Sequence, residues 1–553
     1  MEKAREHIEE IRRTKFSIGG EHNPLTAELH QAIKNLSAEL YAKDVRFLME
    51  LIQNAEDNDY LEGHPPSLEF VITSEDITAT GAPQTLLIFN NEKGFSPKNI
   101  DSICSVGRSP KKGYRKRGYI GEKGIGFKSV FRVTSQPYIF SNGYKIRFNE
   151  EPCPHCNLGY IVPEWVEENP TLSDIRQIYG ATTLPTTTIV LPLKPYKVKH
   201  VKQQLLSIHP EILLFLSKIK QLSVREHNKD PRLNTVSAIA IRSETNFVTR
   251  RNVNAESYTL HLSATHVECS YYMWKQRFPV RQENKVKRRM KVKELVITLA
   301  FPFEEPLNRG MSSPGVYAFL PTEMVTNFPF IIQGDFLLAS SRETILLDNK
   351  WNQGILDCVP SAFFNAFVAL VKTTENVPVS SLAPMFRFIP INNSAYHELN
   401  MVRESIKAKL VEEHIVPSES YTQQKFFHKP HEVGRLKPAF RYILEKARKQ
   451  GVNLLDLSSH GKYILSSSFD EEKYDSIWNF LGLEPVDNEW YAKCIQNSNL
   501  VGGVSEDLHL EILLFVADNF MSKFDCTNMK NIPLLKYLGL DGDESLRIIH
   551  TCF

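Results

Sequence analysis

The sequence predicts an α+β fold for its first third, and three features lead to this prediction. Helical patterns run from Met1 to about Ile18 and from Thr26 to about Asp59. Strand-like apolar runs follow, beginning with SLEFVIT and TLLIFNN, and one glycine-rich stretch interrupts them. Helices followed by mostly antiparallel strands are typical of a sheet covered by helices. We therefore expect an α+β sandwich over residues 1–198.

Two more regions are expected after this domain, because 553 residues exceed one ordinary core. Residues 199–350 start with the helix-like VKQQLLSIHPEILLFLSKI and then alternate strands with loops, which indicates an α/β middle segment. Residues 351–553 are mostly helical by pattern, for example in FRYILEKARKQG. The chain ends at RIIHTCF without a closing cap, which is a weak hint of a longer protein and does not decide whether the chain is a fragment.

Composition gives no sign of a membrane partner or of bulk attraction to nucleic acid, since the net charge is only +2. The N-terminus, MEKAREHIEEIRRTKF, lacks the apolar region of a secretory signal. The longest apolar runs, such as EILLFL and FNAFVALV, are far shorter than the roughly 20 residues of a membrane helix. Eight scattered cysteines favour free thiols in a reducing compartment. We expect a nuclear or cytoplasmic protein.

Three polar side chains share one face of the helix predicted in FLMELIQNAEDNDY. Glu50, Asn54 and Asp57 fall four and then three residues apart, which is helical spacing. The apolar stripe lies roughly opposite and consists of Val45, Leu48, Ile52 and Ala55. Taken alone, such a polar face is typical of a helix surface in contact with water.

Three later segments change this interpretation. LLIFNNEKGFS, residues 86–96, is an apolar strand that ends in polar residues and a glycine. GYIGEKGIGFKSVF, residues 118–131, spaces its glycines so that backbone N–H groups can approach a phosphate. It is not the dinucleotide-binding fingerprint, because no parallel βαβ unit precedes it. TTTIVLPLK, residues 186–194, then places hydroxyl groups at the start of a buried strand.

The four segments in this order resemble the ATP-binding domain shared by DNA gyrase, the ninety-kilodalton heat-shock chaperone, histidine kinases and mismatch-repair proteins, the GHKL superfamily. The resemblance implies a Bergerat-type α/β sandwich, a mixed sheet with helices on one face. It also implies that the polar helix face borders a nucleotide pocket, with ATP and Mg²⁺ as cofactors.

The resemblance assigns roles to individual residues. Glu50 matches the general base that polarises the attacking water. Asn54 matches the amide that ligates magnesium, and Asp57 matches the acid that supports the pocket near the sugar. Asn90 stands where the family usually has an aspartate that accepts a hydrogen bond from the adenine amino group. Thr187 matches the threonine on a later strand that reaches the adenine.

The same comparison covers the loops. Gly94 matches the second glycine of the adenine motif, while Glu92 occupies the place of the first. Arg108, within SVGRS, stands where the chaperone has a phosphate-facing lysine. The phosphate loop GxxGxGF is matched by Gly121, Gly124, Gly126 and Phe127.

Two departures from the family leave an alternative open. The amide of Asn90 is a weaker acceptor than a carboxylate, and Glu92 in place of glycine restricts the loop under the base. The first hypothesis is therefore an ATPase with a chaperone-like lid and domain cycle. The alternative is a non-catalytic scaffold or regulatory protein with a degenerate pocket.

The middle segment contains SSRETI, which resembles the element through which the heat-shock chaperone sends an arginine to the γ-phosphate. Arg342 is the candidate, since a guanidinium there would offset charge on the transferred phosphoryl group. A surface pair of Arg342 and Glu343, at a helix start capped by Ser340 or Ser341, is the alternative.

Four longer stretches narrow the resemblance: YGATTLPTTTIVLPLK, FLPTE, FPFIIQGDFLLASSRE and WNQGI. They resemble the plant No Vein family, whose ATPase-like domain is related to those of sacsin. The resemblance extends from the first helix to about Asn352. It implies a GHKL-type ATPase-like protein of plant origin, whose protein client or partner it does not identify.

A zinc site is considered and not favoured. EPCPHCNLGY contains Cys153 and Cys156 with His155 between them, but zinc needs four ligands. His266 and Cys269 are the only distant candidates, so a plain loop is the favoured interpretation.

Two basic clusters have open roles. KKGYRKRGY, residues 111–119, is a candidate lid that helps to hold phosphates. KVKRRMKVK, residues 285–293, is a candidate nuclear-import or nucleic-acid patch. A solvated loop is favoured for each cluster, so nucleic acid is a possible but not a favoured partner.

Overall fold

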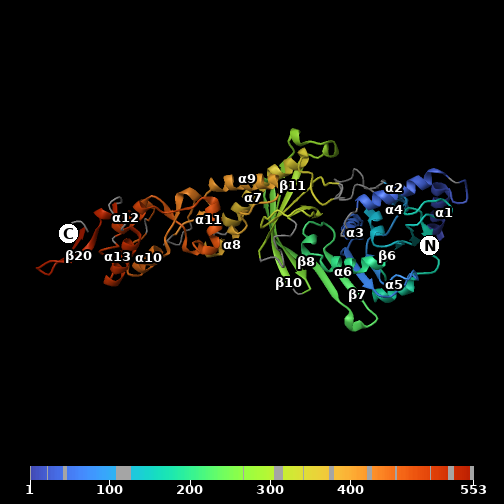
Figure 1. Cartoon of the computed structure of the whole chain (residues 1–553), viewed down its shortest axis with the longest axis horizontal. Helices are drawn as coiled ribbons and strands as arrows, with labels where there is room; N and C mark the ends of the chain where they lie inside the picture. The colour runs from blue at the N-terminus through green and yellow to red at the C-terminus, as the bar shows by residue number, and fades with distance from the viewer. Residues whose placement is uncertain are drawn as a thin grey trace. The chain divides into compact units, whose positions relative to one another are not determined.

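The chain forms two compact units, each described here by itself (Figure 1). The first unit comprises Met1–Val325 and Phe330–Ile355, and the second comprises Thr326–Pro329 and Leu356–Phe553. The computed structural model describes residues 2–21, 23–40, 46–106, 126–265, 267–303, 315–339, 342–372, 379–419, 426–454, 457–498, 500–520 and 528–548.

The first unit combines helices with a large sheet. Its helices are α1 (Glu2–Phe16), α2 (Leu25–Leu40), α3 (Arg46–Asp57), α4 (Pro97–Ile103), α5 (Leu172–Tyr179) and α6 (Val198–Leu206). Its strands are β1 (Ser67–Thr73), β2 (Thr85–Asn90), β3 (Tyr138–Ser141), β4 (Tyr144–Arg147), β5 (Glu164–Trp165), β6 (Thr187–Pro192), β7 (Gln221–His227), β8 (Val236–Arg250), β9 (Ala255–Ala264), β10 (Val267–Pro279), β11 (Glu294–Pro302), β12 (Val316–Ala318), β13 (Leu320–Pro321) and β14 (Ile331–Gly334).

These strands form one mixed sheet of 14 strands, in the order β13-β12-β14-β11-β10-β9-β8-β7-β1-β2-β6-β3-β4-β5. The pairs β1–β7 and β12–β14 are parallel, and the other neighbours are antiparallel. The predicted combination of helices with a mixed sheet is confirmed. Because β1 pairs with β7, the sheet runs without a break across residue 198, and the domain boundary there stays a prediction.

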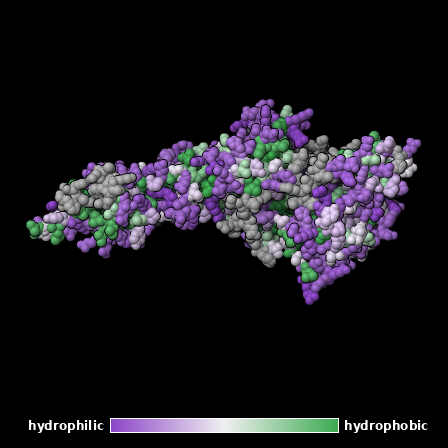
Figure 2. All heavy atoms as spheres, in the orientation of Figure 1, coloured by the Kyte–Doolittle hydropathy of each residue, from purple (hydrophilic) through white to green (hydrophobic). Residues whose placement is uncertain are grey.

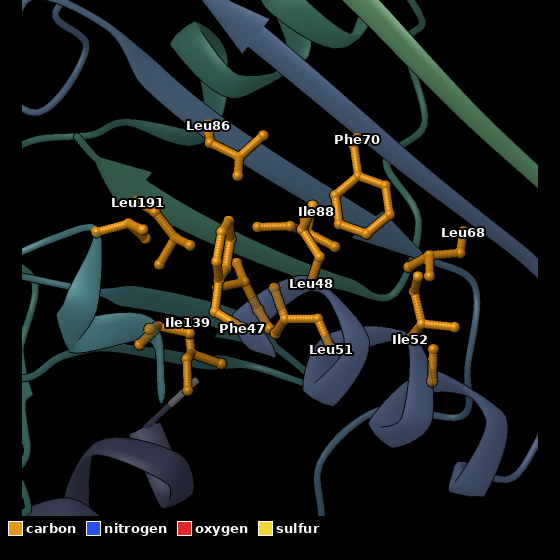
Figure 3. Close-up of a cluster of buried hydrophobic side chains, with 14 of the residues drawn as sticks. Phe47, Leu48, Leu51, Ile52, Leu68, Phe70, Leu86, Ile88, Ile139 and Leu191 are labelled. Atoms are coloured by element: carbon orange, nitrogen blue, oxygen red, sulfur yellow. The ribbon is translucent and has the colours of Figure 1, made fainter. Parts of the chain in front are cut away.

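Helix α3 packs its apolar side chains on one face of this sheet (Figure 3). Four of them, each at most 4% exposed, are Phe47, Leu48, Leu51 and Ile52. They meet strand residues that include Leu68, Phe70, Leu86, Ile88, Ile139 and Leu191. Burial of each such side chain stabilises the fold by about 1.5–3 kcal/mol. The predicted stripe is thus buried, although Val45 lies outside the described residues.

The opposite face of the sheet is also covered, which corrects the expectation of helices on one face only. Ile175 and Ile178 of α5 pack with Val71, Leu87 and Val190 from the strands. The physical reason is that all six residues of both β2 and β6 are buried. Strands that are buried on both faces need cover on both.

Glu56 of α3 joins the helix to the turn before β7. Its carboxylate accepts hydrogen bonds from the backbone N–H of Ser217 at 2.6 Å, of Lys218 at 3.0 Å and of Ile219 at 2.9 Å. The Ser217 hydroxyl donates a further bond at 2.5 Å. Glu56 is only 1% exposed, so these donors replace the water that an ionised carboxylate needs.

The second unit is mostly helical, as predicted. Its helices are α7 (Lys350–Lys372, which begins in the first unit), α8 (Ala383–Phe386), α9 (His397–Val411), α10 (Pro438–Lys449), α11 (Asp475–Leu481), α12 (Asn488–Asn497) and α13 (Glu506–Phe520). Its strands are β15 (Val416–Pro417), β16 (Phe427–His428), β17 (Val433–Arg435), β18 (Tyr463–Ile464), β19 (Glu484–Pro485), β20 (Pro533–Leu538) and β21 (Glu544–Ile548). Figure 2 shows hydrophilic residues over most of the coloured surface in view.

Among the described residues, α7 is long and apolar enough to cross a membrane by length and composition alone. Of its most apolar window, 61% is buried inside the structure, as in the core helix of a globular protein. The run FNAFVALV forms the end of this helix and is short by itself, because Asp357 and Pro360 interrupt the apolar residues before it. The absence of a membrane partner stays a prediction.

We expect Glu56→Gln to lower the free energy of unfolding by about 2 kcal/mol, because an amide group would face backbone donors that now bind a charged acceptor. Urea denaturation of the full chain measures this change. The control is Glu62→Gln, at an exposed position close by. Equal unfolding midpoints for the two variants would contradict the prediction.

Candidate functional site

The polar face of α3 is enclosed by protein. Glu50 is 4% exposed and Asp57 is 2% exposed, while Asn54 is half-buried. A short 3₁₀ helix, η2 (Gly126–Arg132), packs on α3. The alternative of a helix face in contact with water is therefore wrong.

Arg342 reaches this face from a position far along the chain. Its Nη1 lies 2.5 Å from Glu50 Oε1 and also donates to the Oε1 of Gln53, a buried residue one turn further along α3. A buried carboxylate is costly without such a partner. The guanidinium of Arg342 therefore stabilises the buried charge of Glu50.

The backbone of Arg342 is held in the left-handed region, with φ of 59°. This conformation costs a residue other than glycine about 1–2 kcal/mol, so it persists only where its surroundings impose it. Its N–H donates to the carbonyl of Ala339 at 2.9 Å. The described residues 342–349 form no helix, so the alternative of a pair at a helix start is wrong. Ser340 and Ser341 lie outside the described residues.

Gly126 brings the end of the predicted phosphate loop against α3. A Cβ added at this position would overlap with Glu50 Oε2 and would lie 4.0 Å from Asn54 Nδ2. A side chain at this position would require the Glu50 carboxylate to move. Phe127, next in the chain, directs its ring toward Phe148, with ring centroids 6.1 Å apart.

The remaining residues matched to the phosphate region, Arg108, Gly121 and Gly124, lie outside the described residues. The basic cluster at residues 111–119 lies outside them as well. The described part of the site therefore consists of the α3 side chains, Arg342 and the loop end at Gly126.

Asn90 ends β2 with its amide nitrogen already bonded. The Nδ2 donates to the hydroxyl of Tyr60 and to the carbonyl of Ser67, at 2.9 Å each. Its oxygen lies 3.5 Å from Asn58 Nδ2, which is a weak contact. Burial raises the pKa of Tyr60, so its hydroxyl stays protonated and donates to the carbonyl of Ala55 at 2.7 Å. This network ties the end of α3 to the end of β2.

Thr187 takes part in a second buried network, and its partner is Glu92. Thr187 Oγ1 donates to Glu92 Oε1 at 2.7 Å and lies 2.6 Å from Ser141 Oγ. Because Thr187 gives its proton to the carboxylate, Ser141 must donate to Thr187. The N–H of Phe95 then donates to Ser141 at 2.9 Å. Glu92, 4% exposed, is therefore the acceptor on which this chain of hydrogen bonds ends.

Gly94 follows in a conformation that other residues rarely adopt, with φ of 93°. A Cβ here would lie only 2.8 Å from both Asn142 Cβ and Thr186 Cγ2. The positive φ angle and the two close side chains therefore both require glycine at this position of the motif.

Three further residues, Gln53, Ser141 and Lys128, lie at the site without having been predicted from the sequence. Gln53 could have been found, because it follows Glu50 by three residues and so shares its side of the helix. Lys128 is 5% exposed and donates to the carbonyl of Ile103, at the end of α4. Burial lowers the pKa of Lys128 to about 8. No pattern in the sequence indicates this burial.

In the part of the chain that the structure describes, no group of three His, Cys, Asp or Glu residues could hold a metal ion. Cys153 and Cys156 lie in the core, in a turn closed by the bond from Cys153 N–H to the carbonyl of Leu158 at 3.1 Å. Cys269 is buried on β10, and His266 lies outside the described residues.

Residues 26–149 match the family model of the Sacsin domain. This match relates the chain to the class of proteins that contain such a domain. The chain is 32% identical to Protein NO VEIN of Arabidopsis thaliana in an alignment of 428 residues, which covers 73% of this chain and 14% of that protein. It is 26% identical to Sacsin of Homo sapiens in an alignment of 244 residues, which covers 38% of this chain and 5% of that protein. The resemblance to No Vein and sacsin is confirmed, and the chain spans a small part of either relative's length.

We expect Gly126→Ala to displace the Glu50 carboxylate and to lower the free energy of unfolding by about 1–3 kcal/mol, because the added methyl group overlaps with Glu50. Thermal melting of the full chain measures the effect. Gly20→Ala is the matched control, since its Cβ would meet nothing closer than the Ser17 carbonyl at 3.4 Å. A melting temperature equal to that of the control would contradict the close packing of Gly126.

Proposed function

We propose that this chain binds ATP in a Bergerat-type sandwich and hydrolyses it, with Glu50 as the general base. One observation carries the proposal: the buried Glu50 carboxylate contacts both Arg342 and the end of a glycine-rich loop at Gly126. Phosphoryl transfer to water requires a general base, a cation that offsets charge on the phosphoryl group, and backbone N–H groups that can bind the phosphates.

The donor groups around Glu50 fit a magnesium–ATP complex. Magnesium in such sites takes most of its oxygen ligands from phosphates and water and few from the protein. The side-chain oxygen of Asn54 is a suitable single ligand, next to Gly126. When bound, the ion would neutralise charge that develops on the phosphates. Asp57, on the same helix, would support the pocket near the sugar.

The contact between Glu50 and Arg342 suggests how binding and hydrolysis are linked. A γ-phosphate would compete with the carboxylate for the guanidinium of Arg342. The Glu50 carboxylate would then be free to accept a proton from the attacking water, while Arg342 offsets charge on the phosphoryl group. Since Arg342 follows β14 and Glu50 lies on α3, this exchange would move the two segments relative to each other, as in a chaperone-like cycle.

The measurement that tests this proposal is steady-state ATP turnover by the full chain with Mg²⁺. Glu50→Gln keeps the size of the side chain but removes the base, so we expect kcat to fall about 100-fold or more. Glu62→Gln, at an exposed position, is the control and should leave kcat unchanged. Equal turnover by wild type and Glu50→Gln would disprove the role of the carboxylate.

A second candidate function, a scaffold with a degenerate pocket, is favoured by a specific observation. The two residues matched to adenine recognition are bonded within the protein: Asn90 to Tyr60 and Ser67, and Thr187 to Glu92 and Ser141. An adenine ring would have to displace some of these bonds or be recognised by other groups. Displacing a buried hydrogen bond costs about 1–3 kcal/mol, which weakens base recognition.

Thermal shift with ATP and Mg²⁺ separates the two functions. If the chain binds ATP, ligand at about 100 times its Kd stabilises the folded state by about 2.7 kcal/mol, and the melting temperature rises. We expect this rise, and we expect it to be reduced in Asn54→Ala, which lacks the magnesium ligand. No shift at millimolar ATP, together with no heat in a calorimetric titration, would favour the scaffold.

A further inference from the structure

A cavity of about 790 Å³ lies in the first unit, on the part of the sheet formed by β8 to β11 and β14. None of its lining residues belongs to the candidate site around Glu50. Apolar side chains from separate elements form much of its wall, among them Phe215, Leu260, Val296 and Trp351. Its volume falls within the range of about 300–1,000 Å³ that is typical of small-molecule sites.

The basic segment at residues 285–293 forms one side of this cavity. Lys287, Arg288 and Lys291 line it and are exposed. Within the described ranges, no carboxylate forms an ion pair with any of the three. Two other lining lysines are already paired, Lys220 with Glu244 and Lys275 with Glu256. The cavity thus combines an apolar wall with three cations that have no carboxylate partner among the described residues.

Arg289 holds this basic segment in place. It is 4% exposed, and its guanidinium binds both oxygens of Asp335, at 2.8 and 3.2 Å. The backbone carbonyl of Asp335 in turn accepts a hydrogen bond from the indole of Trp351 at 2.8 Å. The interpretation of residues 285–293 as a solvated loop is therefore wrong at Arg289, which anchors the segment that carries the neighbouring exposed cations.

We propose that this cavity binds a small amphipathic anion, a molecule with an apolar body and a single carboxylate, sulfonate or phosphate group. The body would pack on Leu260, Val296 and Trp351, and the anionic group would be held by Lys287, Arg288 and Lys291. A nucleic acid fits less well, because its affinity depends on many phosphate contacts along an extended basic surface. Here three cations of one short segment line a single cavity beside an apolar wall.

The test uses two probes with the same ring system, one charged and one neutral, on the full chain. The anion is 1-anilinonaphthalene-8-sulfonate, and its uncharged counterpart is N-phenyl-1-naphthylamine. We expect saturable fluorescence of the anion, displaced by dodecanoate and not by dodecanol. The triple variant Lys287→Ala/Arg288→Ala/Lys291→Ala should weaken its binding at least about tenfold, because a single charge-assisted contact contributes that much. Binding of the neutral probe should not change.

The control is the double variant Lys285→Ala/Lys293→Ala, which removes charge from the same segment at positions that do not line the cavity. It should bind both probes as the wild type does. Val296→Asp should weaken both probes, because it places a carboxylate in the apolar wall. Equal affinity of the triple variant and the control for the anion would overturn the proposal. Displacement by single-stranded RNA but not by dodecanoate would overturn it in favour of nucleic acid.

Discussion

Helix α3 carries three carboxylates into the interior of the first unit, and the partners of two of them, Glu50 and Glu56, come from distant parts of the sequence. A buried carboxylate is unfavourable unless cations or hydrogen-bond donors surround it. Arg342 provides the cation for Glu50, and the backbone of residues 217–219 provides the donors for Glu56. Both sets of partners lie after residue 198 in the chain. The helix that organises the candidate site therefore depends on the middle segment for its own stability.

The fold was predictable where local pattern decides it. SLEFVIT and most of TLLIFNN coincide with β1 and β2, because β-branched and aromatic residues there are bounded by turn-forming residues. The cover of both sheet faces is indicated by the last four residues of β6, IVLP, which are apolar at consecutive positions. The parallel pairing of β1 with β7 has no such signal. It joins segments far apart in the sequence, and no local periodicity records it.

Some contacts of the candidate site could likewise be predicted from the sequence, and others could not. The order of the motifs was enough to expect Glu50, Asn54 and Gly126 near one another, and Gly126 indeed packs against both side chains. The pairing of Thr187 with Glu92 could not be expected, because it depends on how β2, β6 and β3 align. Cross-strand register follows from the whole sheet and not from one segment.

A truncated protein that stops at residue 198 would keep β1 and its neighbour β2 but would lose β7, the strand on the other side of β1. The alternate residues of β1 whose backbone N–H and C=O groups now face β7 would then lack partners, on a strand that carries mostly apolar side chains. Such edges recruit strands from other molecules. The shortened protein would thus aggregate through its open sheet edge. A fragment that also includes β7 would cover this edge and stay monomeric.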